Sequence, residues 1–394
     1  MFADVLNSTR GAQACRCAAN RMFFQETNMK QRNRSRCAVS FLAAGVLAVS
    51  GCSHLDTPPT YAKGVRIDCG GKQDLTGSGS TAQANAMTHF ITSYEESCSG
   101  KQLTYTGSGS GAGIADFLAA KTDFGGSDSP LGGDEQTSAK QRCGGADAWD
   151  LPVVFGPIAI TFNVNTTDVL DLDAVTLAKI FSGAVTRWDD PAITARNGNM
   201  PAEDIHVVYR SDASGTTDNF QQYLQGAAGG AWTKGAGKVF NGGTGTAAKG
   251  NEGTAEAVKN TEGAISYNEW SYAMKQHLDA AGIQTAGGVA HIGNDFVGKT
   301  ISNVTIKGQG ADPNDLVLDL SKVYATTTPG VYPILLASYE VVCAKYPDAE
   351  VGKAVRAFMQ STVTDGQQGL NQLGYIPLPP EFQTRVAAAV NSIG

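Results

Sequence analysis

The sequence has few of the residue patterns from which metal centres and nucleotide sites are built. Its five histidines are scattered along 394 residues, and no CxxC or HxxxH spacing occurs. No GxxxxGKS or GxxxxGKT phosphate loop is present, and Gly107–Gly113 fits the GxGxxG dinucleotide pattern only with a misplaced final glycine. These absences argue against a metalloenzyme and against a nucleotide-binding protein.

Charge and long apolar runs are also scarce. Charged residues make up 17% of the chain, against 42% hydrophobic residues, which is enough for two domains with cores of their own. The 47 glycines follow no fixed period, so a collagen-like or solenoid fold has no support. Ala38–Val49, an apolar run of about a dozen residues, is too short to span a bilayer comfortably.

That apolar run belongs to an N-terminal targeting segment. It follows a basic stretch, Lys30–Arg36, and precedes Val49-Ser50-Gly51-Cys52, which resembles the lipobox of bacterial lipoproteins. We therefore expect residues 1–51 to be a signal region, with translation starting at Met29, and Cys52 to carry the lipid. Residues 52–64 would form the tether to the membrane. The alternative is a plain secretory signal in which Cys52 is incidental.

Removal of the signal region changes the charge and the cysteine count. Seven of the 30 basic and two of the 37 acidic residues lie in residues 1–51, which leaves 23 against 35 and a net charge near −12. Such an acidic body argues against nucleic acid as a partner. Besides Cys52, the remaining cysteines are Cys69, Cys98, Cys143 and Cys343. In an exported chain they indicate two disulfides, with three connectivities open; metal binding is the rival interpretation.

One strand–turn–helix unit points to an anion. The apolar run 205–209 predicts a strand, 219–224 has helical spacing, and Arg210–Thr217 is the polar turn between them. Free backbone N–H groups at the start of a helix favour an anion, and Arg210 adds a planar, permanently charged donor that Asp212 can orient. The alternative is an ordinary capped helix with a surface arginine.

Two further turns have the same arrangement. Leu75–Ala82 leads into a predicted helix at 84–94, and Thr106–Gly113 joins a strand at 103–105 to a helix at 114–120. Asp128 follows a predicted short strand at 124–127, at the strand end where open α/β sheets bind ligands. We expect these turns and Asp128 to meet at one site.

The rest of the chain predicts an α/β architecture in two parts. The β-rich run 150–165 is interrupted by Gly156-Pro157, which suits a crossover between two domains. The glycine-rich stretch 226–252 predicts a surface loop. Strands are expected at 331–334 and 339–344, returning to the first domain, and helices at 348–361 and 380–393.

Six ordered motifs carry a resemblance to a known family. They are Leu75–Thr81, Gly107–Gly113, Asp123–Asp128, Phe181–Asp190, Arg210–Thr216 and Gly250–Tyr267. Together they resemble the phosphate-binding proteins of bacterial high-affinity phosphate ABC transporters. The resemblance implies a two-lobed, type II periplasmic-binding-protein-like α/β fold. Each lobe would have a central mixed β-sheet flanked by helices, with the ligand in the cleft between the lobes. The expected lobes are 65–157 plus 322–394, and 158–321.

The resemblance also assigns site residues. One inorganic phosphate would be held by Ser80, Thr81, Ala82, Ser110, Asp128, Arg210, Ser214, Gly215 and Thr216. Asp212 would steady Arg210 from behind. Many members have an aromatic residue where this chain has Ala82, so an N–H contact would survive while packing over the ligand is in doubt. A carboxylate facing an anion makes sense if the ligand carries a proton, which phosphate does and sulfate does not.

The resulting hypothesis is a non-enzymatic, monomeric lipoprotein on the outer face of the cell membrane. It would deliver phosphate to ABC permease subunits and need no cofactor. A secreted phosphohydrolase is the first alternative, but it needs a nucleophile with a base or two metals, and no histidine falls within the motifs. A surface adhesin without ligand is the second alternative.

Overall fold

The computed structural model describes residues 67–166, 169–293, 300–301, 304–307 and 312–394. The predicted signal region, Met29, Cys52 and the tether lie outside the described residues. The helices and strands among these described residues all belong to one compact unit. No helix in the described part is both long and apolar enough to cross a membrane.

A nine-stranded mixed sheet organises this unit. Eight of its strands follow the order β2-β1-β3-β14-β4-β8-β6-β7, and β9 pairs with β4. The strands along this path are β2 (Gln102–Gly107), β1 (Asp74–Gly79), β3 (Phe124–Ser127), β14 (Leu335–Cys343), β4 (Ala148–Asn163), β8 (Ala264–Glu269), β6 (His206–Arg210) and β7 (Thr246–Ala248).

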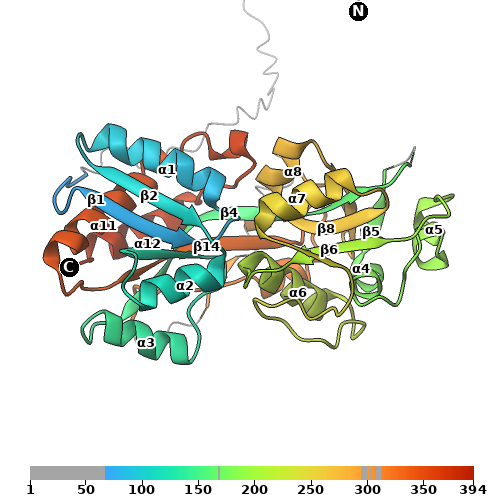
Figure 1. Cartoon of the computed structure of the whole chain (residues 1–394), viewed down its shortest axis with the longest axis horizontal. Helices are drawn as coiled ribbons and strands as arrows, with labels where there is room; N and C mark the ends of the chain where they lie inside the picture. The colour runs from blue at the N-terminus through green and yellow to red at the C-terminus, as the bar shows by residue number, and fades with distance from the viewer. Residues whose placement is uncertain (1–66, 167–168, 294–299, 302–303, 308–311) are drawn as a thin grey trace, which may run out of the picture. The chain divides into compact units, whose positions relative to one another are not determined.

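At one end of the sheet, β1, β2 and β3 are parallel. The crossovers between them are α1 (Ala84–Ser97) and α2 (Ser110–Leu118), which lie on opposite sides of β1 (Figure 1). Right-handed crossovers in the strand order β2-β1-β3 require this placement. Further helices complete this part: α3 (Asp134–Arg142), α11 (Ala349–Thr362) and α12 (Pro380–Asn391), with the 3₁₀ turns η1 (Asp365–Gln367) and η2 (Leu370–Leu373).

At the other end, β6 is parallel to both β8 and β7. Helices α7 and α8 lie on one side of β6 and β8, and α4 and α6 on the other (Figure 1). The helices of this part are α4 (Ala174–Phe181), α5 (Pro191–Asn197), α6 (Gly215–Ala227), α7 (Gly250–Asn260), α8 (Trp270–Gln276) and α10 (Ser321–Tyr324). Short strands β5 (Asp171–Asp173), β10 (Gly282–Thr285) and β11 (Gly288–Ala290) make a second sheet; β9 is Asp279–Ala280, and β12 (Thr305–Ile306) pairs with β13 (Leu318–Asp319).

Strands β4 and β14 connect the two ends, and they run antiparallel side by side (Figure 1). The first part of β4 pairs with β14 up to Pro157, and from Ile158 onward β4 pairs with β8. The change of partner coincides with Gly156-Pro157, where the sequence predicts a crossover. The two-lobed α/β fold with helices around a mixed sheet is confirmed, while the residue limits of the lobes stay a prediction.

The core follows the apolar residues of the strands. Every residue of β14 is buried, and so is every residue of β4 between its two ends, which fits strands covered on both faces. The disulfides pair Cys69 with Cys98 and Cys143 with Cys343, one of the three connectivities left open by the sequence. The expected strand at 331–334 is wrong: the strand begins at Leu335, after the proline at position 333.

Candidate anion-binding site

The first turn, Ser80–Ala82, joins β1 to α1. Ser80 is fully buried, and its Oγ donates a hydrogen bond to Asp128 Oδ2 at 2.7 Å while accepting one from the Ala82 amide at 3.0 Å. Only glycine fits before it at position 79, because φ is +147° there and a Cβ would lie 1.9 Å from the Gly126 carbonyl oxygen. Thr81 is less buried, and its Oγ1 accepts hydrogen bonds from the Asn251 backbone and side chain.

Ser110 opens α2 and connects both ends of the sheet. Its Oγ accepts hydrogen bonds from the Asp128 amide and from the Gly215 amide, each at 3.1 Å. A third contact joins it to Asp128 Oδ2 at 3.5 Å. The chain reaches this position through Gly109, whose φ of +99° favours glycine, and a Cβ there would lie 2.3 Å from Asp212 Oδ2. Ser110 therefore packs directly against the turn that contains Arg210.

Asp128 directly follows β3, and its side chain is buried among hydroxyl groups. Oδ2 accepts from Ser80, and Oδ1 accepts from Ser338 Oγ at 2.7 Å. Burial raises the pKa of Asp128 to about 6, against the opposing effects of the Ser80 and Ser338 hydrogen bonds and the positive charge of Arg210. The carboxyl group is thus ionised at neutral pH but close to its titration range.

Arg210 ends β6, with its guanidinium buried and fixed in place. Its Nε donates to Asp212 Oδ1 at 2.9 Å, a second bond joins Nη2 to Asp212 Oδ2, and Nη1 donates to Thr216 Oγ1 at 3.3 Å. Partial burial acts to raise the pKa of Asp212, but the hydrogen bond and charge of Arg210, with the Gly250 amide, bring it below its usual value. Asp212 is therefore a fixed negative counter-charge.

The residues Ser214, Gly215 and Thr216 form the start of α6. Ser214 caps this helix, because its Oγ accepts from the Thr217 amide at 3.1 Å. Gly215 is required by close packing, since a Cβ there would lie 2.6 Å from the Asp128 Cβ. Thr216 Oγ1 accepts from Arg210 and from Asn251 Nδ2 at 3.2 Å. The three residues are all buried.

The structure therefore brings the predicted site residues together in one cluster. Ser80, Thr81, Ala82, Ser110 and Asp128 come from the β1–β3 end, and Arg210, Ser214, Gly215 and Thr216 from the β6 end. The cluster is polar yet almost entirely excluded from solvent, and helices α2 and α6 both begin in it. Buried N–H groups, hydroxyls and a guanidinium at helix starts can replace the water around a small anion.

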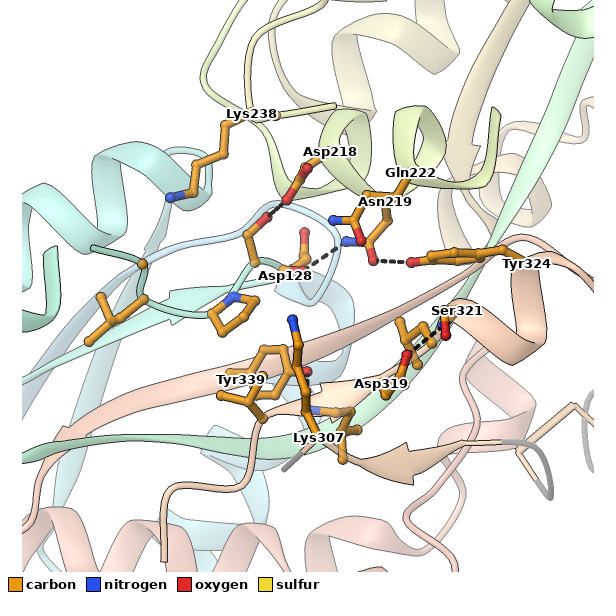
Figure 2. Close-up of a pocket in the computed structure, with 18 of the residues that line it drawn as sticks. Asp128, Asp218, Asn219, Gln222, Lys238, Lys307, Asp319, Ser321, Tyr324 and Tyr339 are labelled. Carbon is orange, nitrogen blue, oxygen red and sulfur yellow. Dashed lines mark hydrogen bonds between the residues drawn. The ribbon is translucent and has the colours of Figure 1, made fainter. Parts of the chain in front are cut away.

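Two cavities border the cluster. One of about 350 Å³ is lined by Thr81, Ser108, Asp212, Lys249 and neighbouring residues. The other, about 840 Å³, is lined on one side by the loop that follows Asp128 (Figure 2). Figure 2 shows how that loop is tied to α6: Asn219 Nδ2 donates to the Asp128 carbonyl at 2.8 Å, and Ser129 Oγ donates to Asp218 Oδ2.

Sequence reasoning missed three residues of the cluster. Asn251 bridges Thr81 and Thr216, and it lies in the quoted motif Gly250–Tyr267, so its amide was a detectable signal. Asn219 lies in the helix that follows the Arg210 turn. Ser338 lies 210 residues from Asp128 in an apolar strand, and nothing local marks it. In the described part of the chain, no group of three or more histidine, cysteine or acidic side chains could hold a metal ion.

Comparisons with known proteins show the family of this chain. The model of the PBP superfamily domain matches residues 59–364. Phosphate-binding protein PstS 3 of Mycobacterium tuberculosis (strain ATCC 25618 / H37Rv) is 55% identical over 370 residues, covering 92% of this chain and 99% of the relative. The PstS 3 protein of Mycobacterium leprae (strain TN) is 54% identical with the same coverage.

Solved structures show the same fold. A high-affinity periplasmic phosphate-binding protein (PfluDING), solved with bound phosphate, matches with a TM-score of 0.64 at 23% identity, over 80% of this chain and 93% of that one. A DING protein matches with the same TM-score at 24% identity, over 80% and 94%. With matches over most of its length to the family model and to close relatives, the chain belongs to the PBP superfamily and, within it, to the PstS-type phosphate-binding proteins.

Proposed function

We propose that this protein binds one inorganic phosphate in the cluster between Asp128 and Arg210 and delivers it to the permease subunits of an ABC transporter. The observation that carries the proposal is the convergence of a buried guanidinium, a buried carboxylate and two helix starts at one place. Relatives named as phosphate-binding proteins support the ligand. A putative phosphate ABC transporter substrate-binding protein from Clostridium perfringens has the same fold, with a TM-score of 0.53 over 78% of this chain.

The roles of the binding residues follow from their chemistry. Arg210 supplies the positive charge, and Asp212 keeps its planar donor group in one orientation. Ser80, Thr81, Ser110, Ser214 and Thr216 supply hydroxyls, and Ala82 and Gly215 supply amides. Hydrogen bonds to a charged partner are each worth roughly 1.5–3 kcal/mol, so a few of them offset the loss of water around a buried phosphate.

Phosphate binding requires two backbone amides of the cluster to exchange their present hydrogen-bond acceptors for phosphate oxygens. The Ala82 amide donates to Ser80, and the Gly215 amide donates to Ser110. Both donors would turn to the ligand when phosphate enters between the two ends of the sheet. Of these two bonds, the one from Gly215 to Ser110 joins the two ends of the sheet, whereas Ala82 and Ser80 belong to the same turn.

Asp128 accounts for the choice of ligand. An ionised carboxylate accepts hydrogen bonds and donates none, so it accepts a hydrogen bond from the hydroxyl of monobasic or dibasic phosphate. Sulfate near neutral pH has no proton to offer, and two acceptors buried face to face cost several kcal/mol. We therefore expect strong preference for phosphate over sulfate.

The phosphohydrolase alternative finds no support in the cluster. Its hydroxyls donate to or accept from carboxylates, amides and Arg210, and among the described residues no histidine lies in it. The relatives carry names of binding proteins, which accords with a non-enzymatic role. No observation favours the adhesin alternative.

The proposed location is the outer face of the cell membrane. Residues 1–51 would direct export, Cys52 would carry the lipid, and residues 52–64 would tether a monomeric body. Two disulfides accord with an oxidising compartment. Replacing Cys52 by serine should release the protein from membranes and abolish incorporation of labelled palmitate, while Cys69 keeps its disulfide.

Calorimetry on the mature chain tests the function directly. Phosphate should bind tightly, sulfate should bind at least a hundredfold more weakly, and a chromogenic phosphoester should show no turnover. Absence of phosphate binding in the properly folded chain would refute the proposal, and turnover of the ester would favour the hydrolase.

A further inference from the structure

Ser338 stands out because its buried hydroxyl serves one partner. The side chain is fully buried in β14, and among the described residues Asp128 Oδ1, at 2.7 Å, is its hydrogen-bond partner. A buried hydroxyl costs free energy unless it is bonded, and an apolar residue would suit the surrounding strand better. The hydrogen bond to Asp128 therefore explains why a serine occupies this position.

The register of the sheet places Ser338 beside Asp128. Strand β14 pairs antiparallel with β3, with Tyr339 opposite Ser127. Ser338 precedes Tyr339 and Asp128 follows Ser127, so continuing this register brings Ser338 beside Asp128, where the two side chains bond. On its other side β14 changes register against β4 between Ser338 and Tyr339. Such bulges redirect side chains, and they are frequent next to functional sites.

Asp128 has hydroxyl donors on both of its oxygens. Ser80 binds Oδ2 and Ser338 binds Oδ1, so the plane of the carboxylate is held from two sides. An ionised carboxylate has about four acceptor positions. Ser80, Ser338 and the longer Ser110 contact occupy three of them, which leaves one for a ligand. Ser80 is itself held by the Ala82 amide, within the proposed phosphate contacts, whereas Ser338 lies behind Asp128 in the sheet.

The ionised state of Asp128 depends on these donors. Burial disfavours the charge, and hydroxyl donors favour it. The titratable groups that act on Asp128 or respond to its charge are Arg210, Glu269, Glu340, Tyr105 and Tyr339. Burial raises the pKa of Glu269 and of Glu340 well above the usual value. Asp218 on α6 is engaged by Ser129.

We propose that Ser338 is a positioning residue for anion selection: its hydroxyl holds Asp128 ionised and correctly turned, and so sets the lower pH limit at which the protein prefers proton-bearing phosphate to sulfate. The inference rests on the proposed phosphate-binding function. Ser338 itself contacts no ligand; it acts through Asp128.

The test is calorimetry of the mature chain with phosphate and with sulfate between pH 5 and 8.5. Wild type should lose phosphate affinity below about pH 6. In Ser338→Ala the midpoint of this loss should move up by about one pH unit or more, with binding about three- to tenfold weaker at pH 7 and approaching wild type at pH 8.5. The preference for phosphate over sulfate should fall over the same range, because protonated Asp128 can donate to sulfate.

Two variants serve as controls. Ser338→Thr keeps the hydroxyl and should keep the wild-type midpoint. Ser266→Ala removes another fully buried hydroxyl, which donates to the Val208 carbonyl, and should leave the midpoint unchanged. If Ser338→Ala does not fold, Ser338→Cys replaces the hydroxyl with a weak donor of similar shape and should move the midpoint in the same direction.

The outcomes separate this inference from the proposed function. Wild type that binds no phosphate at any pH would refute the function. Wild type that binds phosphate, with Ser338→Ala or its cysteine substitute following an unshifted pH profile, would overturn the role of Ser338 alone. A shift equal to that of Ser266→Ala, or a shifted Ser338→Thr, would overturn it as well.

Discussion

The two aspartates of the cluster have the same side chain and opposite environments. Asp128 is buried among hydroxyls, and its pKa is raised to about 6. Asp212 is paired with Arg210 and receives the Gly250 amide, and its pKa lies below the usual value. Under the proposed function, this difference divides two tasks between the aspartates: Asp212 would hold the guanidinium of Arg210 that attracts any oxyanion, and Asp128 would accept a hydrogen bond only from an oxyanion that carries a proton.

The largest expected effect is on the Arg210 side. Arg210→Ala removes the positive charge and leaves Asp212 without its counter-ion, so phosphate affinity should fall at least a hundredfold, corresponding to roughly 3 kcal/mol or more. Isothermal calorimetry checks this. Arg187→Ala removes an exposed arginine paired with Asp189 and Asp204 and should bind like wild type. Equal affinity in the two variants would show that Arg210 is not the anion-binding charge.

A substitution of Asp128 should reduce the preference for phosphate over sulfate more than it reduces the affinity for phosphate. Asp128→Asn replaces an acceptor with a group that can also donate, so phosphate should bind about tenfold more weakly while sulfate binds more tightly. The phosphate-to-sulfate ratio should fall by about a hundredfold. Competition between the two anions for the mature chain measures it. Normal phosphate binding with undiminished rejection of sulfate would contradict the assigned role of Asp128.

The two aspartates should also affect stability with opposite sign as pH changes. The raised pKa of Asp128 means that its contribution is present below pH 3.8 and is lost as pH rises toward 6, by at most about 3 kcal/mol. The lowered pKa of Asp212 means that its contribution is present above 3.8 and is lost as pH falls further. Urea unfolding of ligand-free Asp128→Asn and Asp212→Asn from pH 3 to 7 should give opposite trends relative to wild type; parallel trends would contradict the comparison.

The smallest expected effect lies outside both aspartates. Asn85 on α1 donates to Ser271 Oγ on α8 at 2.8 Å, a contact that joins two helices away from the anion donors. Asn85→Ala should weaken phosphate binding by no more than about fivefold, because one neutral hydrogen bond is worth about 1 kcal/mol. The phosphate-to-sulfate ratio should stay unchanged. A changed ratio in competition calorimetry would mean that selection is not confined to Asp128 and its donors.

Much of the fold was predictable because its signals are local. Apolar periodicity or a Gly-Pro pair within a short stretch of sequence marks each of the following: the strand at 124–127, the helices at 84–94, 348–361 and 380–393, and the crossover at Gly156-Pro157. The Arg210 turn and the two glycine-rich turns were recognisable for the same reason, since strand, turn and helix follow one another within about 20 residues. The strand expected at 331–334 failed where a proline competes with the apolar pattern.

The remaining features depend on contacts between distant segments. Which cysteines pair, with 200 residues between Cys143 and Cys343, is decided by the meeting of α3 and β14. The raised pKa values of Glu269 and Glu340 follow from burial in the sheet, which no local pattern encodes.

The amino-acid sequence by itself determined the three strand–turn–helix units, and it predicted that they present donors for an anion together with one arginine and one facing aspartate. Only the tertiary structure decided how that aspartate is held. The pairing of β14 with β3 places Ser338 beside Asp128, although the two residues are 210 positions apart in the sequence. The physical reason is that turn chemistry is carried by neighbouring residues, whereas the ionisation of a buried carboxylate is set by whatever distant groups the fold packs around it.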